Sequence, residues 1–292
     1  MYIHTYTGDD HDAYVAAYRD DPTALLRIDQ EESARLRDVI IAFYRSHLSD
    51  AEMDGYVVGL SGGVDSATTA TLLADAVGPD KVHAVIMPAP HTDDATVADA
   101  LSVADDLGIS TNDPDRFQDR IADAVDALES LGEQSDEQQL KRGNILARCR
   151  MTVLRDVAKA RTALVAGTTN ASERDLGYMT LAADGRGGID NEALYDLYKT
   201  SERDLARHLD VPDRVITREP TADLWPGQTD AAELGHPYGV LDQVLVGLRL
   251  GMSDADIADA AGDITVEDVH GIRRRKENTA YKREGAPHPS LS

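Results

Sequence analysis

The sequence predicts an α/β protein with a doubly wound parallel sheet and helices on both faces. Apolar runs at residues 56–60, 82–87 and 163–166 each have the length and composition of a buried strand. Longer segments with apolar side chains at helical spacing lie between them. Strands that alternate with helices in this way form βαβ units with parallel strands, and this predicts a Rossmann-like architecture.

The first elements follow from local patterns. Residues 1–30 are polar and weakly patterned, so we interpret them as an N-terminal extension of one domain over residues 31–271. Residues 31–48 carry apolar side chains at helical spacing, which predicts a helix. The strand at 56–60 leads into a helix of small residues that is expected to end near Val77.

The alternation continues in the middle of the chain. Helical spacing predicts a helix over residues 92–107 and a long helix over 138–159. Residues 178–191 are rich in glycine and poor in apolar side chains, so we expect a loop there. After this loop, short helices are predicted over 194–199 and 201–209.

The composition indicates an acidic protein. Asp and Glu total 53 against 29 Lys and Arg, which gives a formal net charge of -24. This balance argues against a nucleic-acid partner, because neutralising phosphates requires an excess of Lys and Arg. No apolar run approaches the roughly 18 residues of a membrane-spanning helix, and residues 1–12 lack the features of a signal sequence. We therefore expect a cytoplasmic protein without membrane contact.

The acidity also suggests adaptation to salt. Asp is the prevalent acid, Lys is scarce relative to Arg, and the chain has 2 Phe. Such a surface repels itself in dilute buffer. At molar salt the Debye length falls to about 3 Å, which screens most of this repulsion. We therefore expect a halophilic protein, with ordinary acidity as the alternative.

A phosphate-binding loop is predicted at residues 61–66, Ser-Gly-Gly-Val-Asp-Ser, between the first strand and its helix. Ligands of open α/β sheets bind at the carboxyl ends of the strands. Glycines let the backbone approach a phosphate, and N–H groups at the helix start point toward it. Asp65 repels a bare phosphate, so it indicates a divalent cation between the two. The loop matches neither G-x-x-x-x-G-K-[ST] nor G-x-G-x-x-G, which disfavours kinase-like and dinucleotide redox functions.

This loop resembles the signature of the N-type ATP pyrophosphatases, which have an adenine nucleotide alpha hydrolase-like fold. Further blocks narrow the family, and the most specific is Leu-Trp-Pro-Gly-Gln-Thr-Asp at residues 224–230. Together with residues 141–151, 167–173 and 196–200, in this order and spacing, the blocks resemble ammonia-dependent NAD synthetase. The resemblance extends over roughly residues 35–287.

The resemblance implies a ligase that forms a carbon–nitrogen bond in two steps. The nicotinate carboxylate of deamido-NAD attacks the α-phosphate of ATP, and pyrophosphate leaves. Ammonia then displaces AMP from the acyl-adenylate and gives the amide, NAD. The implied partners are deamido-NAD, ATP, ammonia and Mg²⁺, and the implied assembly is a homodimer with substrate sites near the interface.

The same resemblance assigns the site residues. Asp65 and Lys199 are the predicted catalytic residues, and Asp65 and Glu173 are the predicted Mg²⁺ ligands. The basic tail, residues 272–292, is expected to close over the substrate. The predicted deamido-NAD contacts are Arg148, Asp190 and Lys282. The predicted ATP contacts are Gly59, Leu60, Ser61, Gly62, Gly63, Val64, Asp65, Ser66, Met87, Thr168, Lys199 and Thr221.

The loop on the deamido-NAD side departs from the family pattern. Leu181 stands where the family has a substrate-binding lysine, and Ala182 where it has an aromatic residue. Residues are inserted around Arg186, which is a candidate to replace the lost charge. Two alternatives stay open: adenylation of another carboxylate, and nucleotide binding without turnover. Modification of tRNA is disfavoured by the net charge and by the single cysteine, Cys149.

Overall fold

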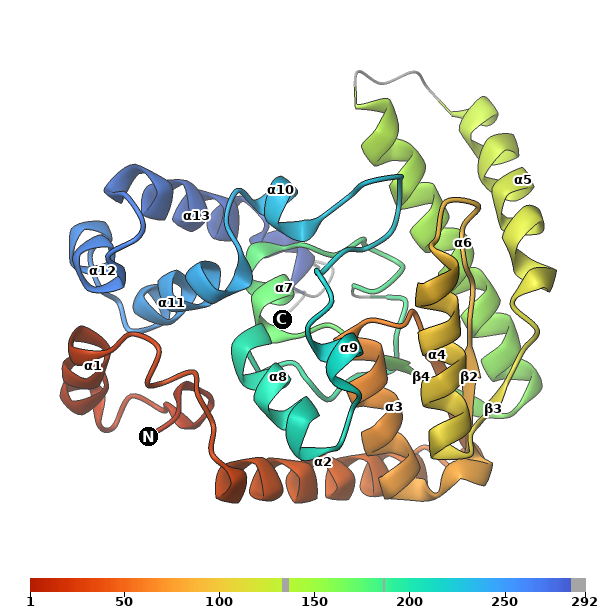
Figure 1. The fold of residues 1–292 in the computed structure, drawn as a ribbon, viewed down its shortest axis with the longest axis horizontal. Helices are drawn as coiled ribbons and strands as arrows, with labels where there is room; N and C mark the ends of the chain where they lie inside the picture. Colours follow the sequence, from red (N-terminus) through yellow and green to blue (C-terminus); the bar gives the residue numbers. More distant parts are fainter. Residues whose placement is uncertain (133–136, 186, 285–292) are drawn as a thin grey trace, which may run out of the picture.

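The computed structural model describes residues 1–132, 137–185 and 187–284, and its core is a five-stranded sheet (Figure 1). All strand pairs are parallel, in the order β3-β2-β1-β4-β5. The strands are β1 (Gly55–Gly59), β2 (Val82–Val85), β3 (Ser110–Thr111), β4 (Ala163–Gly167) and β5 (Asn191–Glu192). The predicted parallel α/β fold is confirmed. β3 and β5 are too short to be expected from periodicity.

The strand order creates a switch point between β1 and β4. After β1 the chain continues outward through β2 and β3, whereas β4 and β5 extend the sheet on the other side of β1. The connections that leave the carboxyl ends of β1 and β4 therefore diverge. In open α/β sheets, ligands bind at this point.

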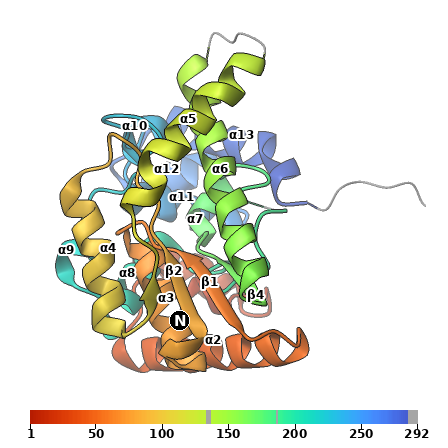
Figure 2. The ribbon, with the colours of Figure 1, turned by 90° about the vertical axis from the view of Figure 1, so that its right-hand side faces the viewer.

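Helices cover both faces of the sheet, as predicted. Along β1, Tyr56 and Val58 join one apolar cluster and Val57 joins another, because successive side chains of a strand point to opposite faces. The helices of the first cluster are α2 (Gln30–Asp50), α3 (Val64–Val77), α4 (Asp94–Leu107), α8 (Lys199–His208) and α9 (Asp213–Ile216). The second cluster contains α5 (Asp115–Leu131) and α6 (Gln138–Ala160), which project past the sheet on the side away from α2 (Figure 2).

A third apolar cluster lies beside the sheet and joins the N-terminal helix α1 to helices from the last third of the sequence (Figure 1). Its helices are α1 (His11–Asp20), α7 (Ala171–Leu176), α11 (Tyr238–Arg249), α12 (Asp254–Ala261) and α13 (Val266–Asn278). The buried Tyr18 hydroxyl donates to the Gln243 carbonyl over 2.9 Å and fixes α1 on α11. The N-terminal extension is therefore packed against the C-terminal helices.

One expectation about local structure is wrong. The predicted helix over 194–199 is absent before Lys199: the chain turns at residues 193–196, Leu194 and Leu197 are buried, and Tyr198 is extended, so that α8 begins at Lys199. The remaining short elements are η1 (Ile3–Thr5), η2 (Pro79–Lys81), α10 (Asp230–Leu234) and η3 (Ala280–Lys282). Among the helices of the described ranges, none is both long and apolar enough to cross a membrane.

Candidate active site

The loop between β1 and α3 is folded by its own serines. Ser66 donates from Oγ to the Gly63 carbonyl over 3.0 Å and accepts from the Ser61 N–H over 3.2 Å. The Ser61 hydroxyl in turn accepts from the Gly63 N–H over 3.2 Å. Gly63 is the N-cap residue of α3 and has no side chain to bond the first N–H groups of that helix. The predicted strand–loop–helix arrangement is present, and the helix dipole favours an anion at this loop.

Gly62 is required because the loop packs closely on α4. Its φ of 84° lies in the left-handed region, and a Cβ at this position would be 2.5 Å from the Thr96 carbonyl oxygen. Thr96 is held by Arg218, which also pairs with Asp99 of α4. Arg218 directly precedes the segment 219–230, so α4 couples the loop to that segment.

Asp65, Glu173 and Lys199 converge from the N-terminal ends of α3, α7 and α8. The Lys199 Nζ lies 2.6 and 2.5 Å from the two carboxylate oxygens of Asp65 and 3.4 Å from Glu173 Oε1. The Lys199 side chain is 2% exposed, whereas those of Asp65 and Glu173 are 20% and 17% exposed. The ammonium therefore lies beneath two carboxyl groups that reach the surface, and residues far apart in the sequence form one cluster.

Asn170 and Glu202 belong to the same cluster, although neither is a predicted site residue. The Asn170 side chain accepts from the Glu173 N–H over 3.0 Å and donates from Nδ2 to Asp65 Oδ1 over 2.7 Å. Glu202 is fully buried, with Oε2 at 3.9 Å from the Lys199 Nζ. Asn170 has a signal in the sequence, an acid three residues later that forms a capping box. The sequence around Glu202 is typical of a solvent-exposed helix position and gives no signal that Glu202 belongs to the site.

Burial and charge shift the protonation equilibria of the cluster in opposite directions. Burial opposes the charge on Asp65, but the Lys199 ammonium and the hydrogen bonds that Asp65 accepts together outweigh it and lower the pKa of Asp65 below its ordinary value. Burial and the Asp65 charge raise the pKa of Glu173 to about 8, and raise the pKa of Glu202 well above its ordinary value. Burial also opposes the charge on Lys199, yet the neighbouring carboxyls raise its pKa. One ammonium and one firmly ionised carboxylate are thus at the centre.

The donor set of this cluster fits a magnesium ion. Asp65 and Glu173 supply carboxylate oxygens, the ligands that Mg²⁺ prefers, and the Lys199 ammonium shows that the space between them favours positive charge. Within residues 1–132, 137–185 and 187–284, no group of three or more His, Cys, Asp or Glu side chains is arranged to hold a metal ion. Mg²⁺ commonly takes one or two carboxylates and completes its shell with phosphate and water.

The residues predicted to bind deamido-NAD are engaged with the chain itself. Arg148 donates from Nε to the Leu181 carbonyl over 3.2 Å. Asp190 accepts from Arg155 Nη1 at 2.7 and 2.8 Å and from the Val165 N–H at 2.7 Å. Both side chains fasten the loop between α7 and β5. The structure therefore gives them a positioning role in the loop between α7 and β5.

Cations of the C-terminal tail hold the far end of α7. Lys282 donates from Nζ to the carbonyls of Gly177 and Met179 over 2.7 and 2.8 Å. Arg275 and Arg283 donate to carbonyls of the last turn of α7. Cations are favourable at a helix C-terminus, where the dipole places partial negative charge. The tail thus stabilises the helix whose first turn carries part of the Asp65 cluster.

The remaining predicted ATP contacts lie on neighbouring segments. Met87 and Thr168 follow the carboxyl ends of β2 and β4, which flank β1, so they share an edge of the sheet with the loop. Met87 is buried, and its carbonyl accepts from Arg150 Nε over 3.1 Å. Thr221 lies after α9, where its hydroxyl accepts from the Asp223 N–H over 3.0 Å. Their roles as ATP contacts stay predictions.

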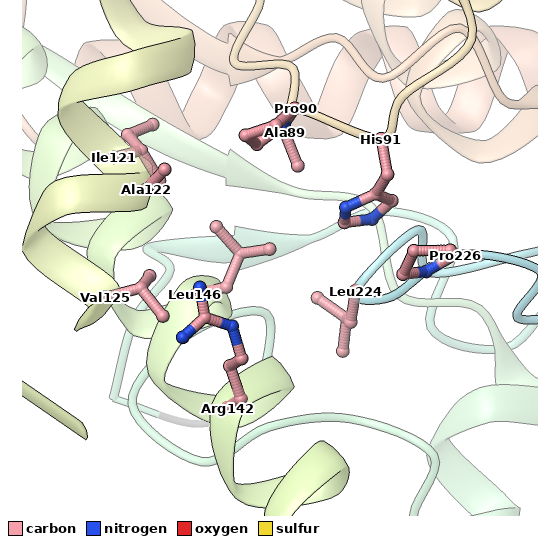
Figure 3. A pocket seen from close by; sticks show the side chains of 10 residues that line it. All are labelled: Ala89, Pro90, His91, Ile121, Ala122, Val125, Arg142, Leu146, Leu224 and Pro226. Atoms are coloured by element: carbon pink, nitrogen blue, oxygen red, sulfur yellow. The ribbon is translucent and has the colours of Figure 1, made fainter. Parts of the chain in front are cut away.

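A cavity of about 320 Å³ lies next to this edge, between α5, α6 and two loops (Figure 3). Figure 3 shows the His91 ring and the Arg142 side chain among apolar side chains. His91 Nε2 is 3.6 Å from Asp223 Oδ1, which joins the loop after β2 to the segment that carries Thr221. The lining residues are Ala89, Pro90, His91, Ile121, Ala122, Val125, Arg142, Leu146, Leu224 and Pro226. Sequence reasoning misses this cavity because several distant segments form it.

The chain matches known proteins along most of its length. It fits the family model described as NAD synthase over residues 36–286. The NH(3)-dependent NAD(+) synthetase of Methanosarcina acetivorans is 40% identical over 254 residues, which cover 86% of this chain and 96% of that protein. The NH(3)-dependent NAD(+) synthetase of Halobacterium salinarum is 36% identical over 259 residues, which cover 86% of this chain and 93% of that protein.

Solved structures agree with the fold. NMN synthetase from Francisella tularensis is similar with a TM-score of 0.74 at 26% identity, covering 90% of this chain and 100% of the other. NH3-dependent NAD synthetase from Campylobacter jejuni, in complex with the nitrate ion, has a TM-score of 0.71 at 25% identity with the same coverage. The family model and the relatives together show that the chain belongs to the NAD synthase family.

Proposed function

We propose that this chain is an ammonia-dependent NAD synthetase, which uses ATP to convert the nicotinate carboxylate of deamido-NAD into the amide. The observation that carries the proposal is the contact of the Lys199 ammonium with both Asp65 and Glu173. Asp65 lies at the start of α3, next to the loop that leaves β1. A lysine, a helix N-terminus and a cation site each favour the charge of a triphosphate. The family and the ammonia-dependent relatives support the overall reaction.

In the first step, a carboxylate oxygen of the substrate attacks the α-phosphorus of ATP. The bond to the bridging oxygen of pyrophosphate breaks, and pyrophosphate leaves with its electrons. The backbone of the loop and the first N–H groups of α3 orient the triphosphate. Lys199 neutralises charge that develops on the departing pyrophosphate. When bound at Asp65 and Glu173, Mg²⁺ supplies Lewis-acid stabilisation of the phosphate oxygens.

In the second step, ammonia attacks the acyl carbon and AMP leaves with the electrons of the carbon–oxygen bond. This route is needed because a free carboxylate is a poor electrophile, whereas the adenylate has a good leaving group. The proposal includes deamido-NAD binding by Arg148, Asp190 and Lys282, each of which must exchange a present hydrogen bond for the substrate. It also includes a homodimer, which sedimentation at high KCl tests.

The test is pyrophosphate release at high KCl with MgATP, ammonium and a panel of carboxylates. We expect release with deamido-NAD, stoichiometric with NAD and AMP. Release with a different acid, and none with deamido-NAD, contradicts the proposed substrate. ATP binding without release on any acid of the panel contradicts catalysis.

A second candidate acceptor is nicotinate mononucleotide, the acid whose amide is NMN. Two observations favour it: the similarity to an NMN synthetase, and Leu181 at the family's substrate-binding lysine. Arg186, the candidate to replace that charge, lies outside the described residues. The mononucleotide lacks the AMP half of the dinucleotide and demands fewer cationic contacts. Comparing kcat/KM for the two acids in the same assay distinguishes the candidates.

A further inference from the structure

The Lys199 ammonium lies where a metal held by Asp65 and Glu173 would compete with it. We propose that Lys199 is an internal competitor of the divalent cation, so that the metal site becomes strong only when nucleotide phosphates take over the ammonium. This inference rests on the metal site of the proposed function. It adds a coupling between nucleotide and metal that arises from one side chain.

The contacts show that both carboxylate oxygens of Asp65 already have hydrogen-bond donors. Both of its carboxylate oxygens accept from the Lys199 Nζ, at 2.6 and 2.5 Å, and Oδ1 also accepts from Asn170 Nδ2 at 2.7 Å. Glu173 Oε1 accepts from the same ammonium at 3.4 Å. The Lys199 ammonium therefore contacts both predicted metal ligands. A metal ion bound by Asp65 and Glu173 has to share their oxygens with this ammonium.

A metal ion bound to Asp65 and the Lys199 ammonium repel each other. Mg²⁺ lies about 2.0–2.1 Å from its oxygen ligands, so an ion on the Asp65 carboxylate is only a few ångströms from Nζ. Repulsion between a divalent cation and an ammonium at this distance is strong in a buried site, where screening is weak. Lys199 is 2% exposed, so water does little to relieve it. Each cation therefore weakens the other's hold on Asp65.

The backbone under Lys199 is fixed, so the side chain alone has to move. The Lys199 N–H donates to Ser172 Oγ over 2.9 Å, and the next N–H, of Thr200, donates to Asp242 Oδ2 over 2.9 Å. Ser172 is itself bound to Asp242 over 2.5 Å. A lysine side chain has several rotatable bonds, so the Lys199 ammonium is able to move. A triphosphate bound in the loop before Asp65 offers this ammonium stronger anionic partners than Asp65 does. The ammonium then leaves Asp65 to the metal.

The experiment measures Mn²⁺ binding without nucleotide, using the electron paramagnetic resonance of free Mn²⁺ at one fixed KCl concentration. Wild type and Lys199→Met are compared, because Met keeps the length of the side chain and removes the charge. We expect Lys199→Met to gain one site at least about tenfold tighter than any in the wild type. Lys159→Met, at an exposed position of α6, removes the same charge and is expected to change nothing.

A double variant and a second substitution complete the test. Adding Asp65→Asn to Lys199→Met is expected to abolish the new site, which separates it from weak binding to the acidic surface. Lys199→Gln serves as a second uncharged variant if Lys199→Met does not fold by circular dichroism. Equal Mn²⁺ affinity of wild type and variants, or a tight site that survives Asp65→Asn, overturns the inference. Pyrophosphate release by the wild type with deamido-NAD tests the proposed function separately.

Discussion

The Asn170 amide donates to the Asp65 carboxylate over 2.7 Å, while its oxygen accepts from the first turn of α7. One side chain thus starts the helix after β4 and orients the acid after β1. These are the two strands at the switch point of the sheet, where the outgoing connections diverge. The contact explains how two distant segments present their carboxyl groups to one ammonium.

Replacing this amide is expected to damage both roles. Asn170→Ala removes the N-cap of α7 and one of the two side chains that donate to Asp65, so we expect a loss of about 1–3 kcal/mol in unfolding free energy. We also expect a fall of at least about tenfold in the rate of pyrophosphate release. Ser253→Ala, which removes the N-cap of α12, is the matched control and is expected to leave the rate unchanged. Equal rates for Asn170→Ala and wild type contradict the orienting role.

Asp65→Ala tests the metal ligand directly. Without the carboxylate, the cation loses one of its two predicted ligands, so we expect turnover to fall by orders of magnitude at saturating MgATP. The measurement is the initial rate of pyrophosphate release. Asp75→Ala, on the exposed side of the same helix where Asp75 pairs with Arg37 at 2.8 Å, is expected to keep the wild-type rate. A rate for Asp65→Ala within about threefold of wild type rules out the metal assignment.

Local signals explain how much of this arrangement is predictable from the sequence. The loop at 61–66 is recognisable because strand, glycines and helix are adjacent in the chain. The meeting of Asp65 and Lys199 is not local, since the two residues are separated by the remainder of the sheet, and only the family resemblance indicates it. Glu202 is not apparent from the sequence because its neighbours there are polar. Its burial arises from the packing of α8 against α3 and from its contact with Asn170 at the start of α7.

The misplaced helix has a similar physical cause. Apolar side chains over residues 194–199 follow helical spacing, but Leu194 and Leu197 pack into the core around a turn at residues 193–196, and this tertiary packing outweighs local propensity. For the substrate side, matching positions alone did not show that Asp190 pairs with Arg155 and that Lys282 bonds backbone carbonyls. Such contacts depend on the fold of a loop that departs from the family pattern.

Lys282→Ala is expected to separate substrate binding from support of α7. If Lys282 exchanges its carbonyl partners for deamido-NAD, its loss raises the KM for that substrate at least about tenfold and leaves the KM for ATP unchanged. Arg275→Ala is the control, because Arg275 donates to the Leu176 carbonyl of the same helix and is not a predicted substrate contact. Steady-state kinetics of both variants is the measurement. If the two variants change the same parameters equally, Lys282 has only the structural role.

His83 is expected to make stability depend on pH. Burial lowers the pKa of His83 to about 4, and its Nδ1 lies 2.8 Å from the Ser110 hydroxyl, which joins β2 to β3. The unfolded chain therefore binds a proton near its ordinary pKa of 6.5 while the folded chain does not. The contribution of the neutral His83 to the unfolding free energy is fully present above pH 6.5. As the pH falls toward 4, the unfolding free energy decreases by up to about 3 kcal/mol.

Urea unfolding between these pH values measures the effect. His83→Gln removes the titrating group, so its unfolding free energy is expected to vary less with pH than that of wild type over the same window. His270→Gln is the control, because His270 lies near Asp254 with most of its side chain exposed. Identical pH profiles for wild type and His83→Gln show that the imidazole is not the source.

The net charge of -24 leads to the last prediction, that salt stabilises the folded chain. Compact folding brings the excess carboxylates together, and their repulsion is weakly screened in dilute buffer. Raising KCl from about 0.1 M to about 2 M shortens the Debye length from about 10 Å to below about 3 Å, so the unfolding free energy is expected to rise. Sucrose, which favours compact states without screening charge, is the control and is expected to stabilise less than KCl. Equal stability at the two KCl concentrations contradicts salt adaptation and leaves ordinary acidity as the explanation of the composition.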